Sequence, residues 1–196
     1  MRHILGLGLA AAVAAGLGFS NVAAAATSCE ADKPTSENNW SDSQRTAQPN
    51  PRFKRQEVAY QTTEAPGTII VETHKTFLYL VLGNGKALRY GIGVGREGFK
   101  WTGSQRIARK AAWPDWHPPK EMLKRDPCLP DMIPGGSDNP LGARALYLGN
   151  TEFRIHGTLY PATIGHSVSS GCIRLTNDDV IDLYNRVKVG TKVVVN

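Results

Sequence analysis

A cysteine and a histidine form the most reactive pair in this sequence. His156 precedes Gly157, Cys172 follows Gly171, and 15 residues separate the pair. A thiol becomes a strong nucleophile when a neighbouring base takes or shares its proton, and histidine suits that task near neutral pH. The glycine before Cys172 permits a turn whose N–H groups face a developing oxyanion. The pattern favours nucleophilic chemistry; the alternative is a structural cysteine and an unrelated surface histidine.

Two other motifs point to different kinds of site. His156, His166 and Cys172 are residue types that bind zinc, but neither an HExxH nor a CxxC spacing supports a zinc site. The segment 93–98 matches the letter pattern GxGxxG of a dinucleotide-binding loop. No helix pattern follows it and no βαβ unit surrounds it, so we interpret its glycines as strand ends and turns.

Runs of β-branched and aromatic residues predict the strands that must position the reactive pair. His156 is expected at the end of one strand. A turn signal at residues 83–86 separates the second predicted strand from the third. The predicted strands cover residues 67–73, 76–82, 87–94, 143–148, 152–156 and 192–195.

One helix is predicted near the C-terminus. Thr176 or Asn177 can cap its start, and Asp178 and Asp179 suit the positive end of its dipole. Gly190 lies just past its end. Four residues fall on one face at helical spacing: Val180, Leu183, Tyr184 and Val187.

Residues 101–139 differ from the rest because proline and glycine recur in them. This composition predicts a long loop or flap, and such loops in compact domains are often functional. Trp113 and Trp116 are flanked by prolines here, and we expect them to pack rather than to contact a ligand. The predicted domain is therefore mainly β, with one clear C-terminal helix.

The N-terminus has the composition of an export signal. Arg2 and His3 precede an apolar run over residues 4–19, and Ala23–Ala26 offers small-residue cleavage sites. The run is too short and too rich in glycine for a membrane span. We therefore predict a cleaved secretory signal peptide over residues 1–26 and an exported, periplasmic protein without a transmembrane span.

Residues 27–56 are polar, lack apolar periodicity and predict a disordered linker, so the domain covers residues 57–196. Three cysteines leave at least one thiol outside any intramolecular disulfide. Cys29 and Cys128 can pair, but the sequence does not fix their distance. Cys29 also follows a weak lipoprotein-type cleavage sequence, so a lipid anchor there is the alternative to a free protein.

The net charge of +6 is concentrated in residues 96–125, which hold eight basic and three acidic residues. Basic charge favours anionic partners. For an exported protein these are peptide carboxylates of the cell wall or anionic lipids, not nucleic acid. A solvated basic surface is the equal alternative.

The segment around the reactive pair resembles the signature of the L,D-transpeptidase catalytic domain family, of the YkuD or ErfK/YbiS/YcfS/YnhG type. The signature is His-Gly-Thr, a spacer, then Ser-(His or Ser)-Gly-Cys-(Ile/Val)-Arg. Here it reads His156-Gly157-Thr158 and Ser169-Ser170-Gly171-Cys172-Ile173-Arg174. Other similar segments are Pro66-Gly-Thr-Ile69, Tyr90-Gly-Ile-Gly-Val-Gly95, Asn139-Pro-Leu-Gly142 and Asn177-Asp-Asp-Val180. The resemblance covers residues 57–196.

The resemblance implies a β-sandwich-like domain that acts on peptidoglycan stem tetrapeptides without a cofactor or a metal. Cys172 would attack the carbonyl of the third stem residue, His156 would handle the proton, and D-Ala would leave. An amine of a second stem would then attack the thioester and form a 3→3 crosslink. Water instead would make an L,D-carboxypeptidase, and an amine of an outer-membrane protein would make an anchoring enzyme.

The resemblance also implies oxyanion-binding or substrate-binding roles for Gly157, Thr158, Ser170, Gly171 and Arg174. The guanidinium of Arg174 suits a substrate carboxylate, and bracing the cysteine loop is the equal alternative.

One departure from the family narrows the site. Many members carry a histidine where this sequence has Ser170, which offers only a hydroxyl. Proton transfer therefore falls on His156, and His166 is expected on a surface loop. Papain-type and NlpC/P60-type hydrolases also pair cysteine with histidine, but there the cysteine comes first. A non-catalytic wall-binding module stays open as a second class.

Overall fold

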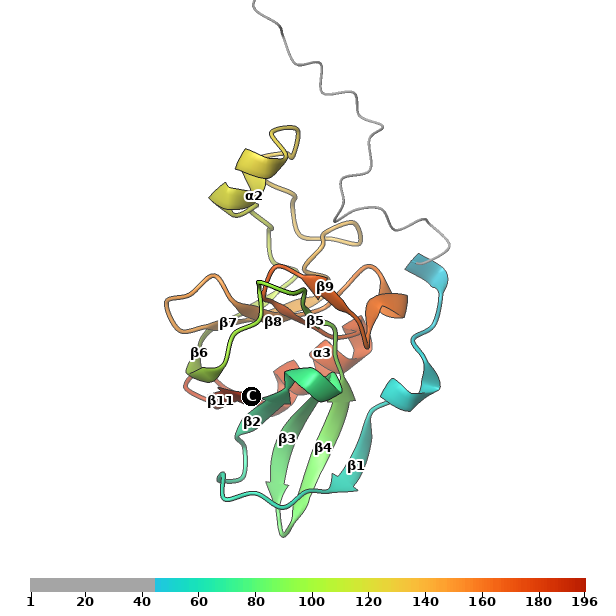
Figure 1. Cartoon of the computed structure of the whole chain (residues 1–196), viewed down its shortest axis with the longest axis vertical. Helices are drawn as coiled ribbons and strands as arrows, with labels where there is room; N and C mark the ends of the chain where they lie inside the picture. The colour runs from blue at the N-terminus through green and yellow to red at the C-terminus, as the bar shows by residue number, and fades with distance from the viewer. Residues whose placement is uncertain (1–44) are drawn as a thin grey trace, which may run out of the picture. The chain divides into compact units, whose positions relative to one another are not determined.

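The structure is a computed structural model that describes residues 45–196 (Figure 1). Nine strands form one sheet in the order β1-β4-β3-β2-β11-β6-β7-β8-β10, and β5 pairs with β9 in a second, two-stranded sheet. The predicted signal peptide, most of the predicted linker and Cys29 lie outside the described residues. Within residues 45–196 no helix has the length and apolar character that a bilayer crossing requires.

The nine-stranded sheet has two halves. The first half consists of β1 (Gln56–Ala59), β2 (Ile69–Glu72), β3 (Phe77–Gly83), β4 (Lys86–Gly91) and β11 (Lys192–Val195). The second half consists of β6 (Gly103–Ala112), β7 (Arg144–Leu148), β8 (Arg154–His156) and β10 (Ile173–Arg174). The separate pair consists of β5 (Val94–Gly95) and β9 (Ser167–Ser169), which run parallel.

The strand β6 joins the two halves. Its residues 103–106 pair antiparallel with β11, and its residues 107–112 pair antiparallel with β7, across an irregularity between Ile107 and Arg109. Buried side chains of both halves belong to one apolar cluster, among them Leu78 of β3 and Leu146 of β7. The two halves therefore enclose a common core, which confirms the predicted β-sandwich-like architecture.

Helix α3 (Asn177–Arg186) closes this core and has the predicted cap and face. The Thr176 hydroxyl accepts a hydrogen bond from the Asp179 N–H at 3.2 Å. Val180 and Leu183 are fully buried, and Tyr184 packs against the core cluster. The apolar face predicted from the spacing is thus the face that contacts the sheet.

The prediction of a long loop over residues 101–139 is wrong for its first part, because β6 is a strand of ten residues. Ile107 is its one buried side chain, so β6 lacks the apolar alternation that reveals a half-buried strand. Hydrogen bonding to β7 and β11 holds it instead. The remainder, residues 113–139, is irregular apart from the short helix α2 (Lys120–Arg125).

Short elements complete the chain. The 3-10 helices are η1 (Pro51–Phe53), η2 (Thr73–Lys75) and η3 (Pro161–Thr163). Phe53, which the sequence places in the linker, is buried against Phe77 with ring centroids 5.5 Å apart. The end of the predicted linker therefore packs on the domain. The segment 93–98 runs through β5 and a turn toward β6, without a helix, as the interpretation of its glycines requires.

Candidate active site

Two adjacent parallel strands position the reactive pair. On β8 and β10, Ile155 lies opposite Ile173, and His156 lies opposite Arg174. Successive side chains of a strand point to opposite faces, and both isoleucines are buried in the core. His156 and Arg174 therefore project from the other face. Cys172 is two residues before Arg174, so the same alternation directs it to the face that carries His156.

His156 is a buried, neutral imidazole. It is 4% exposed, and its Nδ1 lies 2.6 Å from the carbonyl oxygen of Gly157. Because a carbonyl can only accept, this contact assigns the proton to Nδ1 and leaves the lone pair on Nε2. Burial first and then the charge of Arg174 lower the pKa of His156, backbone hydrogen bonds to Gly157 and Leu141 oppose them, and the resulting pKa is about 3.

The turn that carries Cys172 depends on the glycine before it. Gly171 has φ of +103°, and a Cβ there would lie 2.7 Å from Cε1 of Phe153. Trp101 stacks on Phe153 with centroids 4.5 Å apart, and its Nε1–H donates to the Gly171 carbonyl at 2.9 Å. The two rings therefore fix the backbone immediately before the nucleophile.

A serine braces the other side of the same turn. The Ser169 hydroxyl donates to the Cys172 carbonyl at 2.5 Å and accepts from the Gly171 N–H at 3.3 Å. Within residues 45–196 the Cys172 N–H has no hydrogen-bond acceptor, whereas the Gly171 N–H is engaged. Cys172 is partly exposed, and its Sγ lies 3.8 Å from the Glu152 carbonyl oxygen.

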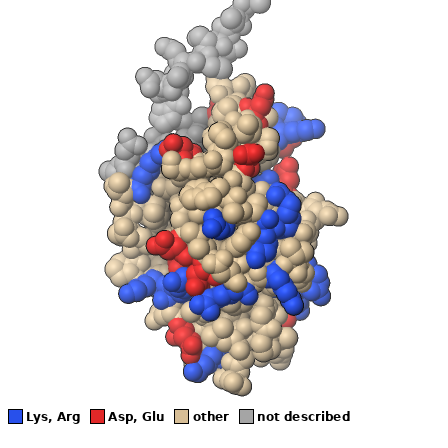
Figure 2. Space-filling view, turned by 180° about the vertical axis from the view of Figure 1, so that it is seen from behind, with Lys and Arg blue, Asp and Glu red and all other residues tan. Residues whose placement is uncertain are grey.

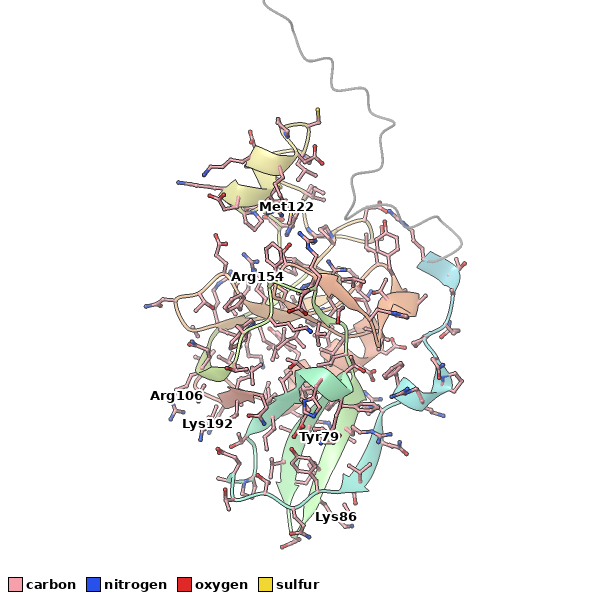
Figure 3. All side chains as sticks on the ribbon, viewed as in Figure 1. Tyr79, Lys86, Arg106, Met122, Arg154 and Lys192 are labelled. Atoms are coloured by element: carbon pink, nitrogen blue, oxygen red, sulfur yellow. The ribbon has the colours of Figure 1, made fainter. Side chains whose placement is uncertain are left out.

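Cys172 and His156 line one cavity of about 710 Å³, a volume in the range of small-molecule sites. Residues 113–139 form a wall of it through the side chains of Trp116, Met122 and Leu129. Figure 3 labels Met122 on α2 and Arg154 on β8, which both line the cavity. The flap-like segment thus contributes an apolar wall, and β8 and β10 contribute the polar one.

The sequence model described as YkuD, L,D-transpeptidase catalytic domain, matches residues 66–195. The chain belongs to the L,D-transpeptidase catalytic domain family. Probable L,D-transpeptidase YbiS of Escherichia coli K12 is 35% identical over 147 residues, which cover 70% of this chain and 47% of that protein. The chain spans about half the length of the curated relatives that it matches first.

Solved structures of L,D-transpeptidases share this fold. The catalytic domain of the Enterococcus faecium L,D-transpeptidase, acylated by ertapenem, has a TM-score of 0.53 and 18% identity. The match covers 69% of this chain and 100% of that domain. At this identity the likeness shows the fold alone.

A crystal structure from Brucella melitensis is more similar in sequence and carries a different name. It is described as a probable carnitine operon oxidoreductase, is 48% identical, covers 75% of this chain and 96% of that one, and has a TM-score of 0.52. That name describes the Brucella melitensis protein and not this chain. In this L,D-transpeptidase domain the GxGxxG segment leads from a strand into a turn and another strand, so it does not form a βαβ dinucleotide-binding unit.

The structure brings most of the predicted site residues of this L,D-transpeptidase domain together. Ser170 and Arg174 line the same cavity as the reactive pair. Thr158 does not; it is 3% exposed, and its hydroxyl accepts from the Tyr160 N–H at 3.1 Å. Thr158 therefore shapes the turn after β8.

His166, Trp113 and Trp116 differ in their position relative to the cavity. His166 is exposed on the loop before β9 and is not among the cavity residues. No three His, Cys, Asp or Glu side chains of residues 45–196 gather as metal ligands. Trp113 is 48% exposed, whereas Trp116 lines the cavity. That both tryptophans pack rather than contact a ligand stays a prediction.

Cys128 and Cys172 differ in oxidation state. Cys128 of the flap-like segment is disulfide-bonded, and Cys172 is a free thiol. The candidate nucleophile is therefore available in the oxidised chain.

Three contributors to the site were assigned no role from the sequence: Ser169, the Trp101–Phe153 stack and Arg154. Ser169 belongs to the signature itself, and Arg154 shares the strand alternation of His156. That alternation is the signal that could have identified Arg154. Nothing local in the sequence pairs Trp101 with Phe153.

Proposed function

We propose that this family member is a peptidoglycan L,D-transpeptidase that works through a thioester on Cys172. The observation that carries the proposal is that a free thiol and a neutral histidine line one cavity. The Gly157 carbonyl holds Nδ1 of His156. Nε2 is therefore the nitrogen that accepts a proton. This is the arrangement of nucleophile, base and orienting group that covalent catalysis uses.

In the acylation step, His156 takes the thiol proton while the sulfur of Cys172 bonds to the carbonyl carbon of the third stem residue. The bond to the terminal D-Ala then breaks, and the imidazolium returns the proton to the departing amine. A thiolate beside His156 would raise the pKa of its imidazole, because opposite charges favour the charged forms. The first proton transfer therefore leaves the pair neutral overall, and in the second the substrate oxyanion balances the charge of the imidazolium.

In the second step, an amine of another stem peptide attacks the thioester, and the thiolate leaves. The amine loses its proton to Nε2 of His156, which returns it to the Cys172 thiolate, and the product is a 3→3 crosslink. With water as the acceptor the same thioester gives an L,D-carboxypeptidase, and with an amine of an outer-membrane protein it gives protein anchoring. The first step is common to all three outcomes.

The oxyanion of both steps has one backbone donor that the turn leaves available. The Cys172 N–H is without an acceptor in the described part of the chain, and the Gly171 N–H donates to Ser169. We assign the oxyanion to the Cys172 N–H, with Ser170 as a hydroxyl donor at the cavity surface. Gly171 acts through its backbone angle.

Arg174 lies opposite His156 and lines the cavity, where it suits a substrate carboxylate. Gly157 acts through its carbonyl, which orients His156. The predicted signal peptide of residues 1–26 places the enzyme outside the cytoplasm, in the periplasm, where peptidoglycan stems are its partners.

The test is to incubate the mature chain with purified disaccharide-tetrapeptide and to identify the products by mass. Crosslinked dimers support transpeptidation, tripeptides alone support the carboxypeptidase, and exchange of D-Ala for an added D-amino acid supports an acyl-enzyme open to amines. Binding without any turnover would favour the non-catalytic wall-binding module.

A further inference from the structure

A row of side chains crosses three strands toward Cys172. Arg109 of β6 lies opposite Tyr147 of β7, and Tyr147 lies opposite Arg154 of β8. Directly opposite residues share a face of the sheet. Because Arg154 is two residues before His156 on the same strand, this row lies on the face that carries the reactive pair.

The aromatic ring at the centre of the row orders both cations. The guanidinium carbon of Arg109 lies 3.5 Å from the centroid of the Tyr147 ring, and that of Arg154 lies 5.5 Å from it. Cations within about 6 Å of an aromatic face are attracted to it. Both guanidiniums are therefore held at one ring, and the sequence segment rich in basic residues contributes Arg109 to this row.

Arg154 lines the cavity with Cys172 and makes no ion pair within residues 45–196. Its Nε is buried there without a hydrogen-bond partner. The cavity also holds the carboxylates of Asp126, Asp138 and Glu152, of which Asp138 is paired with Arg45 at 2.9 Å. Its charge also lowers the pKa of His156, which places the guanidinium within electrostatic reach of the base.

One face of the domain carries a group of basic side chains. On the face shown in Figure 2, Lys and Arg side chains follow one side of the domain. In Figure 3, Arg154 lies between α2 and the strands below it. A buried guanidinium donor without a partner is costly, so a ligand that supplies an acceptor there gains a strong interaction.

We propose that Arg154, ordered by Tyr147 and Arg109, is a specificity-determining residue that binds a free carboxylate of the stem peptide beside Cys172. This inference rests on the proposed function, because it takes the stem peptide as the ligand. A planar guanidinium pairs bidentately with a carboxylate and loses that geometry when it is replaced by lysine. A stem tetrapeptide carries several carboxylates, and the test identifies which of them Arg154 binds.

The test measures binding, so that it does not depend on turnover. Calorimetry measures the Kd of the stem tetrapeptide for the Cys172→Ala chain. The Kd is then measured for peptides in which one carboxylate at a time is converted to an amide. We expect amidation of one carboxylate to weaken binding about 10-fold to 100-fold, the range for charge-assisted hydrogen bonds. In Cys172→Ala/Arg154→Gln that loss should vanish, because the amide and the acid then bind equally. The position whose amidation matters identifies the carboxylate.

Two controls make the result specific. Arg52→Gln removes the same charge at an exposed position outside this cavity and should keep the full discrimination. Arg154→Gln should keep the far-UV circular dichroism spectrum of the parent chain and an unfolding transition as cooperative as in the parent, which shows an intact fold.

The inference is overturned if the Cys172→Ala chain binds no tetrapeptide, if no amidation weakens binding, or if the discrimination persists in Arg154→Gln. Failure of the proposed function looks different: the wild-type chain binds the peptide with carboxylate discrimination but releases no D-Ala. Arg154→Lys should recover only part of the discrimination.

Discussion

His156 must accept a proton although its surroundings disfavour the charged form. Burial and the charge of Arg174 together hold its pKa near 3. A weak base of this kind works only when the proton donor becomes negative at the same moment and remains close. At the scale of single residues, the proposed chemistry therefore depends on the juxtaposition of Cys172 and His156 more than on the intrinsic basicity of the imidazole.

The thiol prediction separates two cysteines of different state. Cys172→Ala should abolish all turnover of disaccharide-tetrapeptide, because the serine hydroxyls of the turn are far weaker nucleophiles than a thiolate. Cys128→Ala should leave turnover largely intact, since Cys128 is disulfide-bonded and is not among the cavity residues. Product formation by mass spectrometry is the measurement. Normal activity of Cys172→Ala would end the thiol mechanism.

The buried imidazole also predicts how stability depends on pH. In the unfolded chain a histidine has a pKa of about 6.5, above the value of about 3 in the folded chain. Between these values the unfolded state binds more protons, so acidification destabilises the fold by up to about 1.4 kcal/mol per pH unit through this one group. The stabilising effect is complete above about pH 6.5 and is lost as the pH falls toward 3.

The measurement is urea unfolding of the wild type and of His156→Gln at several pH values from 7.5 to 4. The free energy of unfolding should fall more steeply with acidification in the wild type. His74→Gln is the matched control, because the His74 side chain is 64% exposed, and it should keep the wild-type slope. Parallel curves for wild type and His156→Gln would contradict the buried, neutral assignment.

At the scale of elements, the end of β8 and the start of α3 fit together without room for a side chain. Asn177 at the start of α3 accepts a hydrogen bond from the Ala143 N–H at 2.9 Å. A Cβ on Gly157 would overlap Oδ1 of the same asparagine. The carbonyl that orients His156 is therefore positioned by helix packing.

Gly157→Ala should consequently displace that carbonyl. We expect kcat/KM to fall about 100-fold, the size of effect that misplacing a catalytic group by about 1 Å produces, together with a lower Tm. Gly136→Ala is the control, because a Cβ at Gly136 would meet nothing within 4 Å, and both quantities should stay at the wild-type level. Unchanged kinetics in Gly157→Ala would show that the orientation of His156 does not depend on this contact.

At the scale of the whole described domain, β11 links the first half of the sheet to β6, the strand that joins the two halves. It pairs parallel with β2 and antiparallel with β6. Val193 of β11 is fully buried in the common core, whereas Val189 in the preceding turn is 57% exposed. The same substitution at the two positions therefore tests whether β11 packs in the core.

Val193→Ala should lower the free energy of unfolding by about 2 kcal/mol, the transfer and cavity cost of a buried branched side chain. Val189→Ala should change it by less than about 0.5 kcal/mol. Denaturant titration followed by circular dichroism measures both. Equal effects at the two positions would contradict the placement of β11 in the centre of the sheet.

The elements of the sheet differ in how well the sequence alone could predict them. The sequence runs of β2, β3 and β7 were predictable because their apolar side chains are nearly continuous, and α3 was predictable because its apolar residues share one face. The strand β6 was missed because it buries a single side chain and is held by its neighbours. Its assignment requires the long-range pairing with β11, which no local pattern contains.

The candidate site divides in the same way. Residue types and spacing identified Cys172 and His156, since few side chains perform that chemistry. The contributions of Trp101 and Arg154 depend on contacts across the sheet, with Phe153 and Tyr147 respectively. Thr158 belongs to the signature but serves a turn, which a motif cannot reveal.

In the proposed mechanism Cys172 carries the stem peptide as a thioester. The intact mass of the chain after brief incubation with disaccharide-tetrapeptide and acid quenching measures this intermediate directly. We expect a mass increase equal to the disaccharide-tripeptide acyl group, located by digestion on the peptide that contains Cys172 and absent from Cys172→Ala. An unmodified wild-type chain that nevertheless releases D-Ala, or an adduct that persists in Cys172→Ala, would contradict it.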